Sequence, residues 1–166
     1  MKRIHYLTLS LVVILADAFT KWIVSTHVEL HEAIPVIPNL FQLVHVRNTG
    51  AAFGIGANTE SHLVPLLLNG GAITVFFVVV VYAFRSAVSD RLLQVALHMI
   101  LGGAIGNLLD RFRFGYVVDF LDFYLRNHHW PAFNLADSAI CIGIALLFLD
   151  MRRRPEEKPV TATGRA

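Results

Sequence analysis

The residues from 63 to 84 carry no charged side chain and include the run VFFVVVV. A helix needs roughly 20 mainly apolar residues to cross about 30 Å of hydrocarbon, so this stretch is long enough to span a bilayer. The chain has 166 residues, of which 55% are hydrophobic and only 16% are charged, whereas a soluble domain is about 25% charged. A water-exposed globule of this size has too little interior for so many apolar side chains. We therefore predict an integral membrane protein.

Four segments are apolar and long enough to be spans, at about 4–24, 63–84, 92–109 and 136–150. The first has a rival interpretation as a cleavable signal peptide, because Lys2 and Arg3 precede an apolar run that ends in ADA at 16–18. The acidic residue in that triplet and the apolar residues at 22–24 favour an uncleaved span. Residues 1–151 are thus predicted to form one membrane domain, followed by a polar, proline-containing tail at 152–166 that we expect to be disordered.

Basic residues in short loops gather on the cytoplasmic side of a membrane. In a four-helix path eight basic residues fall on one side: Lys2, Arg3, Arg85, Arg91, Arg152, Arg153, Arg154 and Lys158. Both termini are therefore predicted to be cytoplasmic, and the connections at 25–62 and 110–134 face outward. Because these basic residues lie between apolar segments and form no stripe, we do not expect a nucleic-acid partner.

The outer connections contain two segments with local patterns. FQLVHVRNT at 41–49 suits a strand, with Pro35 and Pro38 before it and NTG and FGIG after it as turn signals, so a small sheet on the membrane surface is predicted. YVVDFLDFYL at 116–125 is amphipathic enough to lie at the membrane interface. Long ordered loops on a rigid scaffold commonly carry function.

Ionisable and amide side chains gather at the outer ends of the predicted spans, and at membrane depth each such charge is a functional-site hypothesis. They are Asp17 and Lys21 in the first span, Asn107, Asp110 and Arg111 in the third, Asn134 and Asp137 in the fourth, and Asp119 in the outer segment. Each also has a structural interpretation. Asp17 and Lys21 suit a helical ion pair, Asn134 and Asp137 suit helix caps, and Asp110 with Arg111 suits solvated rim residues. Asp122 is interpreted as solvated or paired.

Asp119 and Asp137 come from separate segments and are predicted to meet in one pocket at the edge of the hydrocarbon. Low dielectric and mutual repulsion separate the proton affinities of two such carboxyls. One can then activate water as a base while the other protonates a leaving amine. Because coupled carboxyls titrate as a pair, neither role is assigned to one of them.

Zinc binding, transport and close helix packing are further interpretations of the sequence. HVELHE at 27–32 places two histidines four residues apart, but it is not HExxH and no clear third zinc ligand follows. A transporter or non-catalytic assembly factor with a buried charge network is the alternative function, although a transporter should have internal repeats or broken helices near mid-membrane. Gly102 and Gly106 have the spacing that allows close helix packing.

Four motifs in one order carry a resemblance to a known family. They are DAFTKW at 17–22, VRNTGAAFG at 46–54, GGAIGNLLDRFRFGYVVDFLD at 102–122 and FNLADSAI at 133–140. Together they make the sequence similar to the bacterial lipoprotein signal peptidases, the type II signal peptidases. The likeness covers nearly the whole chain.

The resemblance implies an all-α membrane protein of four transmembrane helices, with a small extracytoplasmic β-cradle and an interfacial half-helix over the pocket. It implies an aspartic endopeptidase of the bacterial inner membrane that cleaves diacylglyceryl-modified prolipoproteins before the lipidated cysteine. The family's catalytic pair corresponds to Asp119 and Asp137. Positions that line or support the site correspond to Asn48, Asn107, Arg111, Asn134, Asp17 and Lys21. No metal or organic cofactor is implied, membrane lipid is a further partner, and we expect a monomer.

Overall fold

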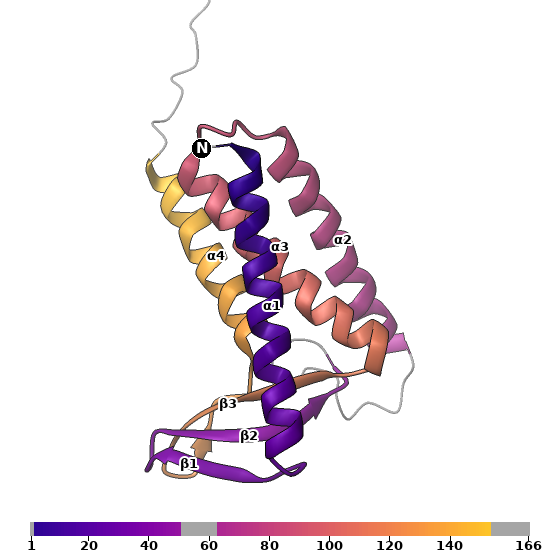
Figure 1. Ribbon diagram of the computed structural model, residues 1–166, viewed down its shortest axis with the longest axis vertical. Helices are drawn as coiled ribbons and strands as arrows, with labels where there is room; N and C mark the ends of the chain where they lie inside the picture. Colours follow the sequence, from indigo (N-terminus) through magenta and orange to yellow (C-terminus); the bar gives the residue numbers. More distant parts are fainter. Residues whose placement is uncertain (1, 51–62, 154–166) are drawn as a thin grey trace, which may run out of the picture.

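The computed structural model describes residues 2–50 and 63–153, which form four helices and a small antiparallel sheet. The helices are α1 (Arg3–His27), α2 (Leu63–Arg85), α3 (Arg91–Phe114) and α4 (Leu135–Arg153). The strands are β1 (Ala33–Ile37), β2 (Phe41–Asn48), β3 (Val117–Leu125) and β4 (His128–His129). The helices form a bundle with the sheet at one end, and the amino-terminal end of α1 lies at the other (Figure 1).

Helices form at all four predicted spans. Two of them, Arg3–His27 and Arg91–Phe114, are long and apolar enough on composition to cross a membrane, and the described apolar part of α2, Gly70–Arg85, is shorter. The existence of four helices is therefore confirmed, while four membrane crossings stay a prediction. The helix α4 continues to Arg153 and includes the first two residues of the predicted tail. The rest of that tail lies outside the described residues.

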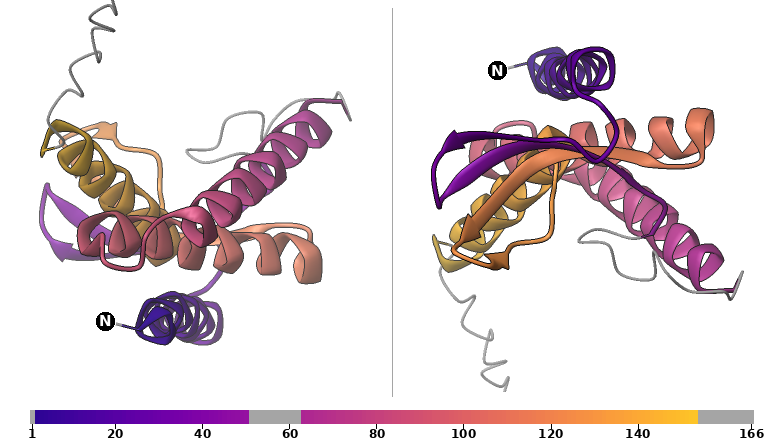
Figure 2. Two further views of the ribbon diagram at one scale, coloured as in Figure 1. Left: turned by 90° about the horizontal axis from the view of Figure 1, so that it is seen from above. Right: turned by 90° about the horizontal axis from the view of Figure 1, so that it is seen from below.

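The third helix lies in the middle of the bundle. α1 covers one side of α3, while α4 and α2 pack on the other side and diverge from each other (Figure 2). Two groups of buried apolar side chains hold the elements together. One joins α2 to α3 through Ala83, Leu93, Leu97 and Leu101, and the other joins the end of α1 to the sheet through Val24, Val28, Val118 and Phe120.

Glycines let α3 approach its neighbours closely. A Cβ atom on Gly102 would lie 2.9 Å from the carbonyl oxygen of Ser10 in α1, and one on Gly103 would overlap the carbonyl oxygen of Ala136 in α4. At Gly106 an added Cβ would lie 2.8 Å from Oδ2 of Asp17. The predicted close packing at Gly102 and Gly106 is thus confirmed, and it places the outer end of α3 directly between α1 and α4.

The sheet has the order β1-β2-β3-β4 with all neighbours antiparallel. The predicted strand at 41–49 is confirmed as β2. Pro35 was expected to mark a turn, but it lies inside β1. A proline is tolerated there because β1 is an edge strand and one side of its backbone needs no donor. The FGIG segment, predicted to turn, lies outside the described residues.

The prediction of an interfacial helix at 116–125 was wrong, because this segment forms the central strand β3. The helix α3 ends at Phe114 and is capped by Gly115, whose φ of +77° is left-handed and favours glycine. The valines and aromatic residues that follow suit a strand, and they pair with β2 from Phe41 opposite Phe123 to Asn48 opposite Val117. No interfacial half-helix occurs in residues 2–50 or 63–153.

Arginines occur at the bundle end opposite the sheet. The start of α1, the connection between α2 and α3 and the end of α4 all lie there (Figure 1), which places Arg3, Arg85, Arg91 and Arg153 at one end. This arrangement is the one that the predicted topology requires, although the side of the membrane on which it lies stays a prediction.

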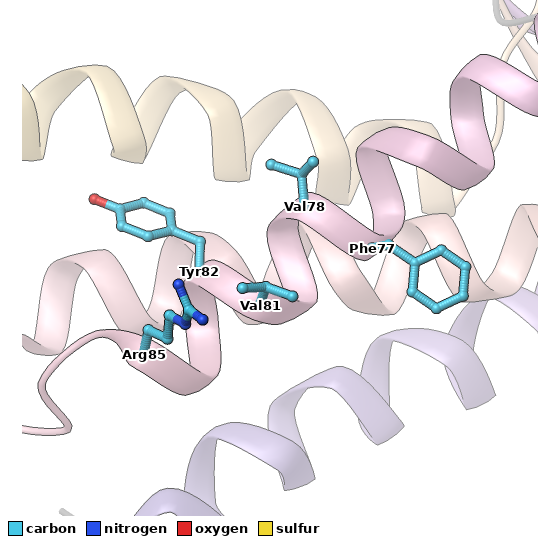
Figure 3. Close-up of a pocket in the computed structure, with 5 residues that line it drawn as sticks. All are labelled: Phe77, Val78, Val81, Tyr82 and Arg85. Carbon is cyan, nitrogen blue, oxygen red and sulfur yellow. The ribbon is translucent and has the colours of Figure 1, made fainter.

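Large apolar side chains are exposed along the helices. Phe77 and Val78 of α2 are 60% and 62% exposed, and they line a shallow hollow of about 490 Å³ together with Val81, Tyr82 and Arg85 (Figure 3). Apolar surface of this extent marks contact with a membrane or a partner. Hydrocarbon would solvate these side chains without penalty, as the composition predicts for a membrane protein.

The contact between Gly103 and α4 predicts a large effect of a single methyl group. Gly103→Ala should lower the unfolding temperature of the purified protein in detergent, because overpacking against a backbone carbonyl typically costs about 1–3 kcal/mol. Gly71→Ala is the matched control, since an added Cβ there meets nothing within 4 Å. Its unfolding temperature should be unchanged or slightly higher, because alanine favours the helix by about 0.5–1 kcal/mol. Equal unfolding temperatures for the two variants would contradict the tight contact.

Candidate active site

The pairing of β2 with β3 brings Asn48 to Asp119. Val46 lies opposite Asp119, and Asn48 follows two residues later with its side chain on the same face of the sheet. Nδ2 of Asn48 donates a hydrogen bond of 2.9 Å to Oδ2 of Asp119. Asp119 is only 2% exposed, so its carboxyl is almost completely buried.

The start of α4 is fixed against the same strand. Phe133 and Leu121 form a short antiparallel bridge, with N–H···O distances of 3.0 and 2.8 Å between their backbones. Asn134 follows Phe133, and its Nδ2 donates to Oδ1 of Asp119 at 2.7 Å. The residue is fully buried. Both oxygens of Asp119 therefore accept a hydrogen bond from an asparagine.

Asn134 also caps the helix that carries Asp137. The backbone N–H of Asp137 donates to Oδ1 of Asn134 at 2.9 Å, and the backbone N–H of Asn134 donates to Oδ2 of Asp137 at 3.3 Å. This reciprocal arrangement satisfies two N–H groups at the helix start. The two predicted catalytic carboxyls are thus connected through one residue.

Asn107 of α3 is the second link to Asp137. Its Nδ2 donates to Oδ1 of Asp137 at 2.7 Å, and its Oδ1 accepts from Nδ2 of Asn134 at 3.3 Å. Oδ1 also accepts from the Lys21 ammonium at 2.9 Å. Asn107 therefore joins the charged group on α1 to the carboxyl on α4.

The Lys21 ammonium is surrounded by acceptors. It forms ion pairs of 2.7 Å with Oδ2 of Asp17 and 2.8 Å with Oδ2 of Asp110, and Lys21 and Asp17 are 4% and 1% exposed. Oδ1 of Asp17 accepts the backbone N–H of Ala136 at 2.9 Å. The ion pair consequently fastens the first turn of α4 to α1, in addition to supporting Asn107.

Arg111 lies on α3 next to this network. Its Nη2 donates to the carbonyl oxygen of Gly50 at 3.0 Å, and its positive charge acts on the carboxylates of Asp137, Asp119 and Asp110. The guanidinium therefore connects α3 to the segment that follows β2. Its positive charge also lies near Asp119 and Asp137.

The pKa of Asp119 is raised from the ordinary value of 3.8 to about 6, mainly because the carboxyl is buried and in part because the Asp137 carboxylate lies nearby. The N–H donors of Asn48 and Asn134 and the charge of Lys21 act in the opposite direction. A carboxyl with this pKa exchanges its proton near neutral pH, which is the property that acid-base chemistry requires.

The structure brings the predicted site residues into one network, in which Asp17, Lys21, Asn48, Asn107, Asn134 and Arg111 surround Asp119 and Asp137. Their catalytic roles stay predictions. The structural interpretations also hold for two pairs, because Asp17 and Lys21 form the ion pair and Asn134 and Asp137 form the cap.

Sequence reasoning missed one partner in this network. Asp110 was left open between a functional-site residue and a solvated rim residue, and its ion pair with Lys21 was not predicted. The spacing of Asn107 and Asp110 along one helical face was the available signal. Asp122 is paired, as one interpretation held, because its Oδ2 accepts from Nε2 of Gln42 at 2.7 Å and lies 2.8 Å from Nδ1 of His129.

The rival patterns find less support. Within the described ranges, no group of three or more His, Cys, Asp or Glu side chains is close enough to hold a metal ion. In the HVELHE segment, Nδ1 of His27 lies 2.9 Å from the carbonyl oxygen of Ile23, one helical turn back. The transporter interpretation expects charges near mid-membrane, whereas this network lies at the bundle end that meets the sheet.

Comparisons with known proteins agree on one family. The profile described as "Signal peptidase (SPase) II" matches residues 9–153. A lipoprotein signal peptidase of Syntrophotalea carbinolica is 50% identical over 86% of this chain and 88% of its own length, and one of Yersinia enterocolitica is 40% identical over 97% and 94%. Two solved structures described as a bacterial membrane enzyme are 29% and 28% identical, with TM-scores of 0.74 and 0.77. The first covers 93% of each chain, and the second covers 91% of this chain and 94% of its own.

The raised pKa of Asp119 predicts a pH-dependent loss of stability. Between about pH 4 and pH 6 the folded protein holds a proton on Asp119 that the unfolded chain has released, so stability falls as pH rises through this window. The shift from 3.8 to about 6 corresponds to at most about 3 kcal/mol. Unfolding temperatures from pH 4 to pH 7 should decline more steeply for the wild type than for Asp119→Asn, which has no proton to lose. Parallel curves would contradict the raised pKa.

Proposed function

The chain belongs to the signal peptidase II family, and from this premise we propose that it is an aspartic endopeptidase that uses Asp119 and Asp137. Its substrates are diacylglyceryl-modified prolipoproteins, which it cleaves before the lipidated cysteine. The observation that carries the proposal is the position of Asn134, which hydrogen-bonds the carboxylate of Asp119 through its side chain and that of Asp137 through its backbone. A buried carboxyl and a partly buried one that share one partner are suited to divide acid and base roles.

The chemistry needs only water and the two carboxyl groups. One carboxylate takes a proton from water, and the water oxygen bonds to the carbonyl carbon of the scissile amide. The other carboxyl gives its proton to the amide nitrogen as the C–N bond breaks. The products are the carboxyl end of the signal peptide and the free amine of the lipidated cysteine. The pair has gained one proton and lost one, so a proton transfer between them restores the starting state.

Polar groups around the pair supply orientation. Arg111 is a cation next to both carboxylates, and Asn48, Asn107 and Asn134 present amide groups there. These groups would hold the carbonyl and N–H groups of the peptide next to the two carboxyls. Lys21 and Asp17 would keep Asn107 and the start of α4 in position. Positioning of this kind removes much of the entropic barrier to reaction.

The location of the network suits a substrate that arrives through the membrane. A lipidated precursor carries its scissile bond close to the headgroup level. The network joins β3 to the start of α4, where the helical bundle meets the sheet (Figure 1). The exposed apolar faces of the helices would accept the signal helix and acyl chains. We place the protein in the bacterial inner membrane as a monomer, with both termini cytoplasmic and the site at the outer face.

Substitution of either carboxyl tests the proposal directly. Asp119→Asn and Asp137→Asn should each lower the cleavage rate of a diacylglyceryl-modified prolipoprotein by at least about 100-fold, the usual contribution of a positioned acid or base. The rate is measured with purified protein in detergent or lipid vesicles. Either variant with undiminished turnover would refute the proposed pair.

Asp122→Asn is the matched control. It lies three residues from Asp119 on the same strand, is 6% exposed, and bonds to Gln42 and His129 away from the pair. An asparagine keeps an oxygen acceptor for these partners, so turnover should stay within a few-fold of the wild type. Addition of a metal chelator should leave all rates unchanged, and loss of wild-type activity with a chelator would favour zinc chemistry.

Lipid recognition predicts a difference between two forms of one substrate. The precursor that lacks diacylglyceryl should be processed much more slowly than the modified precursor, because it loses the acyl contacts that hold the scissile bond at the pair. The measurement compares kcat/KM for both forms at the same lipid concentration. Equal values would remove lipid recognition from the proposal while leaving the aspartic chemistry intact.

A further inference from the structure

The side-chain amide of Asn107 has one carbonyl oxygen and one NH₂ group. Its neighbours determine which of these two groups points to Lys21 and which to Asp137. Oδ1 faces the Lys21 ammonium at 2.9 Å, and Nδ2 faces Oδ1 of Asp137 at 2.7 Å. An ammonium can only donate and an ionised carboxylate can only accept. The reverse orientation would place NH₂ against the ammonium and oxygen against the carboxylate. The amide therefore has one satisfied orientation when Asp137 is ionised.

The ammonium that imposes this orientation is itself fixed. Asp17 from the same helix and Asp110 from α3 hold it at 2.7 and 2.8 Å, and Lys21 is 4% exposed. The ammonium donates to both carboxylates, so its position relative to Asn107 is fixed from two sides. The donor direction thus runs from Lys21 to Asn107 and from Asn107 to Asp137.

The two candidate catalytic carboxyls differ in what supports a negative charge. Asp137 accepts from an amide that a buried cation polarises, and it lies in the first turn of α4, where the helix dipole favours an anion. Asp119 lies in a strand and accepts from Asn48 and Asn134, which are neutral. A strand supplies no comparable field.

The other charged groups around the pair have been considered as well. Asp17 and Lys21 from α1 nearly balance each other, and Asp110 and Arg111 from α3 add one charge of each sign. Arg111 acts on both carboxylates, with the larger effect at Asp137, so it favours a negative charge on Asp137. The chain of donors from Lys21 and the position at the helix start act in the same direction.

We propose that Lys21, held by Asp17 and Asp110, is a positioning residue that fixes the Asn107 amide toward Asp137 and so makes Asp137 the ionised member that activates water. Asp119 is then the member that carries the proton to the leaving nitrogen. This assignment rests on the proposed aspartic peptidase function and adds to it which carboxyl has which role.

In this assignment the step balances. The Asp137 carboxylate takes a proton from water as the water oxygen bonds to the scissile carbonyl carbon. Asp119 loses its proton to the amide nitrogen as the C–N bond breaks. After product release, Asp137 is protonated and Asp119 is ionised, and one proton passes from Asp137 to Asp119, directly or through water, to restore the pair.

The test uses two matched substitutions and the pH profile of kcat/KM for a diacylglyceryl-modified prolipoprotein. Asn107→Asp keeps an acceptor for Lys21 but replaces the N–H that faces Asp137 by a carboxylate oxygen. The acid limb of the profile, where Asp137 must lose its proton, should move to higher pH by about one unit, because a like charge favours the protonated form. The maximum rate should fall, since more of the singly protonated pair then holds its proton on Asp137.

Asn48→Asp makes the same change next to Asp119. It should move the alkaline limb to higher pH and leave the acid limb nearly unchanged. If Asn107→Asp moves the alkaline limb and Asn48→Asp moves the acid limb, the two roles are reversed and the inference is overturned. A role in folding alone would lower the amount of active protein without moving either limb, and that result would overturn it as well.

The role of Lys21 is tested in the double variant Lys21→Met with Asp110→Asn. It removes both partners of the Lys21–Asp110 ion pair without a change in net charge. The acid limb should again move to higher pH, because the Asn107 amide loses the cation that orients it. An unmoved acid limb in folded protein would remove Lys21 from the inference. Full activity of Asp119→Asn or Asp137→Asn would refute the catalytic pair on which the inference rests, so the two failures are distinguishable.

Discussion

The whole arrangement of the site depends on the hydrogen bonds of Asn134. Its side chain donates to Asp119 on β3 and accepts the N–H of Asp137 in α4, so one residue sets the relation of a strand to a helix. The preceding residue pairs with Leu121 and thereby fixes the direction in which α4 leaves the sheet. A buried amide has to satisfy both of its polar ends, and here each end has a partner on a different element.

Burial of so many charged groups requires that each be paired, because an isolated ion at membrane depth costs several kcal/mol. Lys21 lies between Asp17 and Asp110, and Asp17 also accepts a backbone N–H of α4. These short contacts are possible because Gly102, Gly103 and Gly106 let α3 lie close to α1 and α4. Helix packing and the charge network therefore depend on the same small residues.

Much of this could be predicted from the sequence, and the exceptions have one cause. Apolar length gave the four helices, and β-rich composition gave β2. The segment at 116–125 was misassigned because its apolar and acidic residues suit either an amphipathic helix or a strand, and the partner that decides is β2, more than 60 residues away in the chain. The pairing of Asp110 with Lys21 was missed for the same reason, since it joins two helices that sequence spacing cannot bring together.

The asymmetry between the two carboxyls follows from the fold itself. One lies on a central strand, enclosed by neighbouring backbone and side chains, and the other lies in the first turn of a helix. Burial disfavours charge on the first, while the helix start favours it on the second. A strand and a helix start therefore stabilise a negative charge to different extents. Lys21, through its hydrogen bond to Asn107, increases this difference between Asp119 and Asp137.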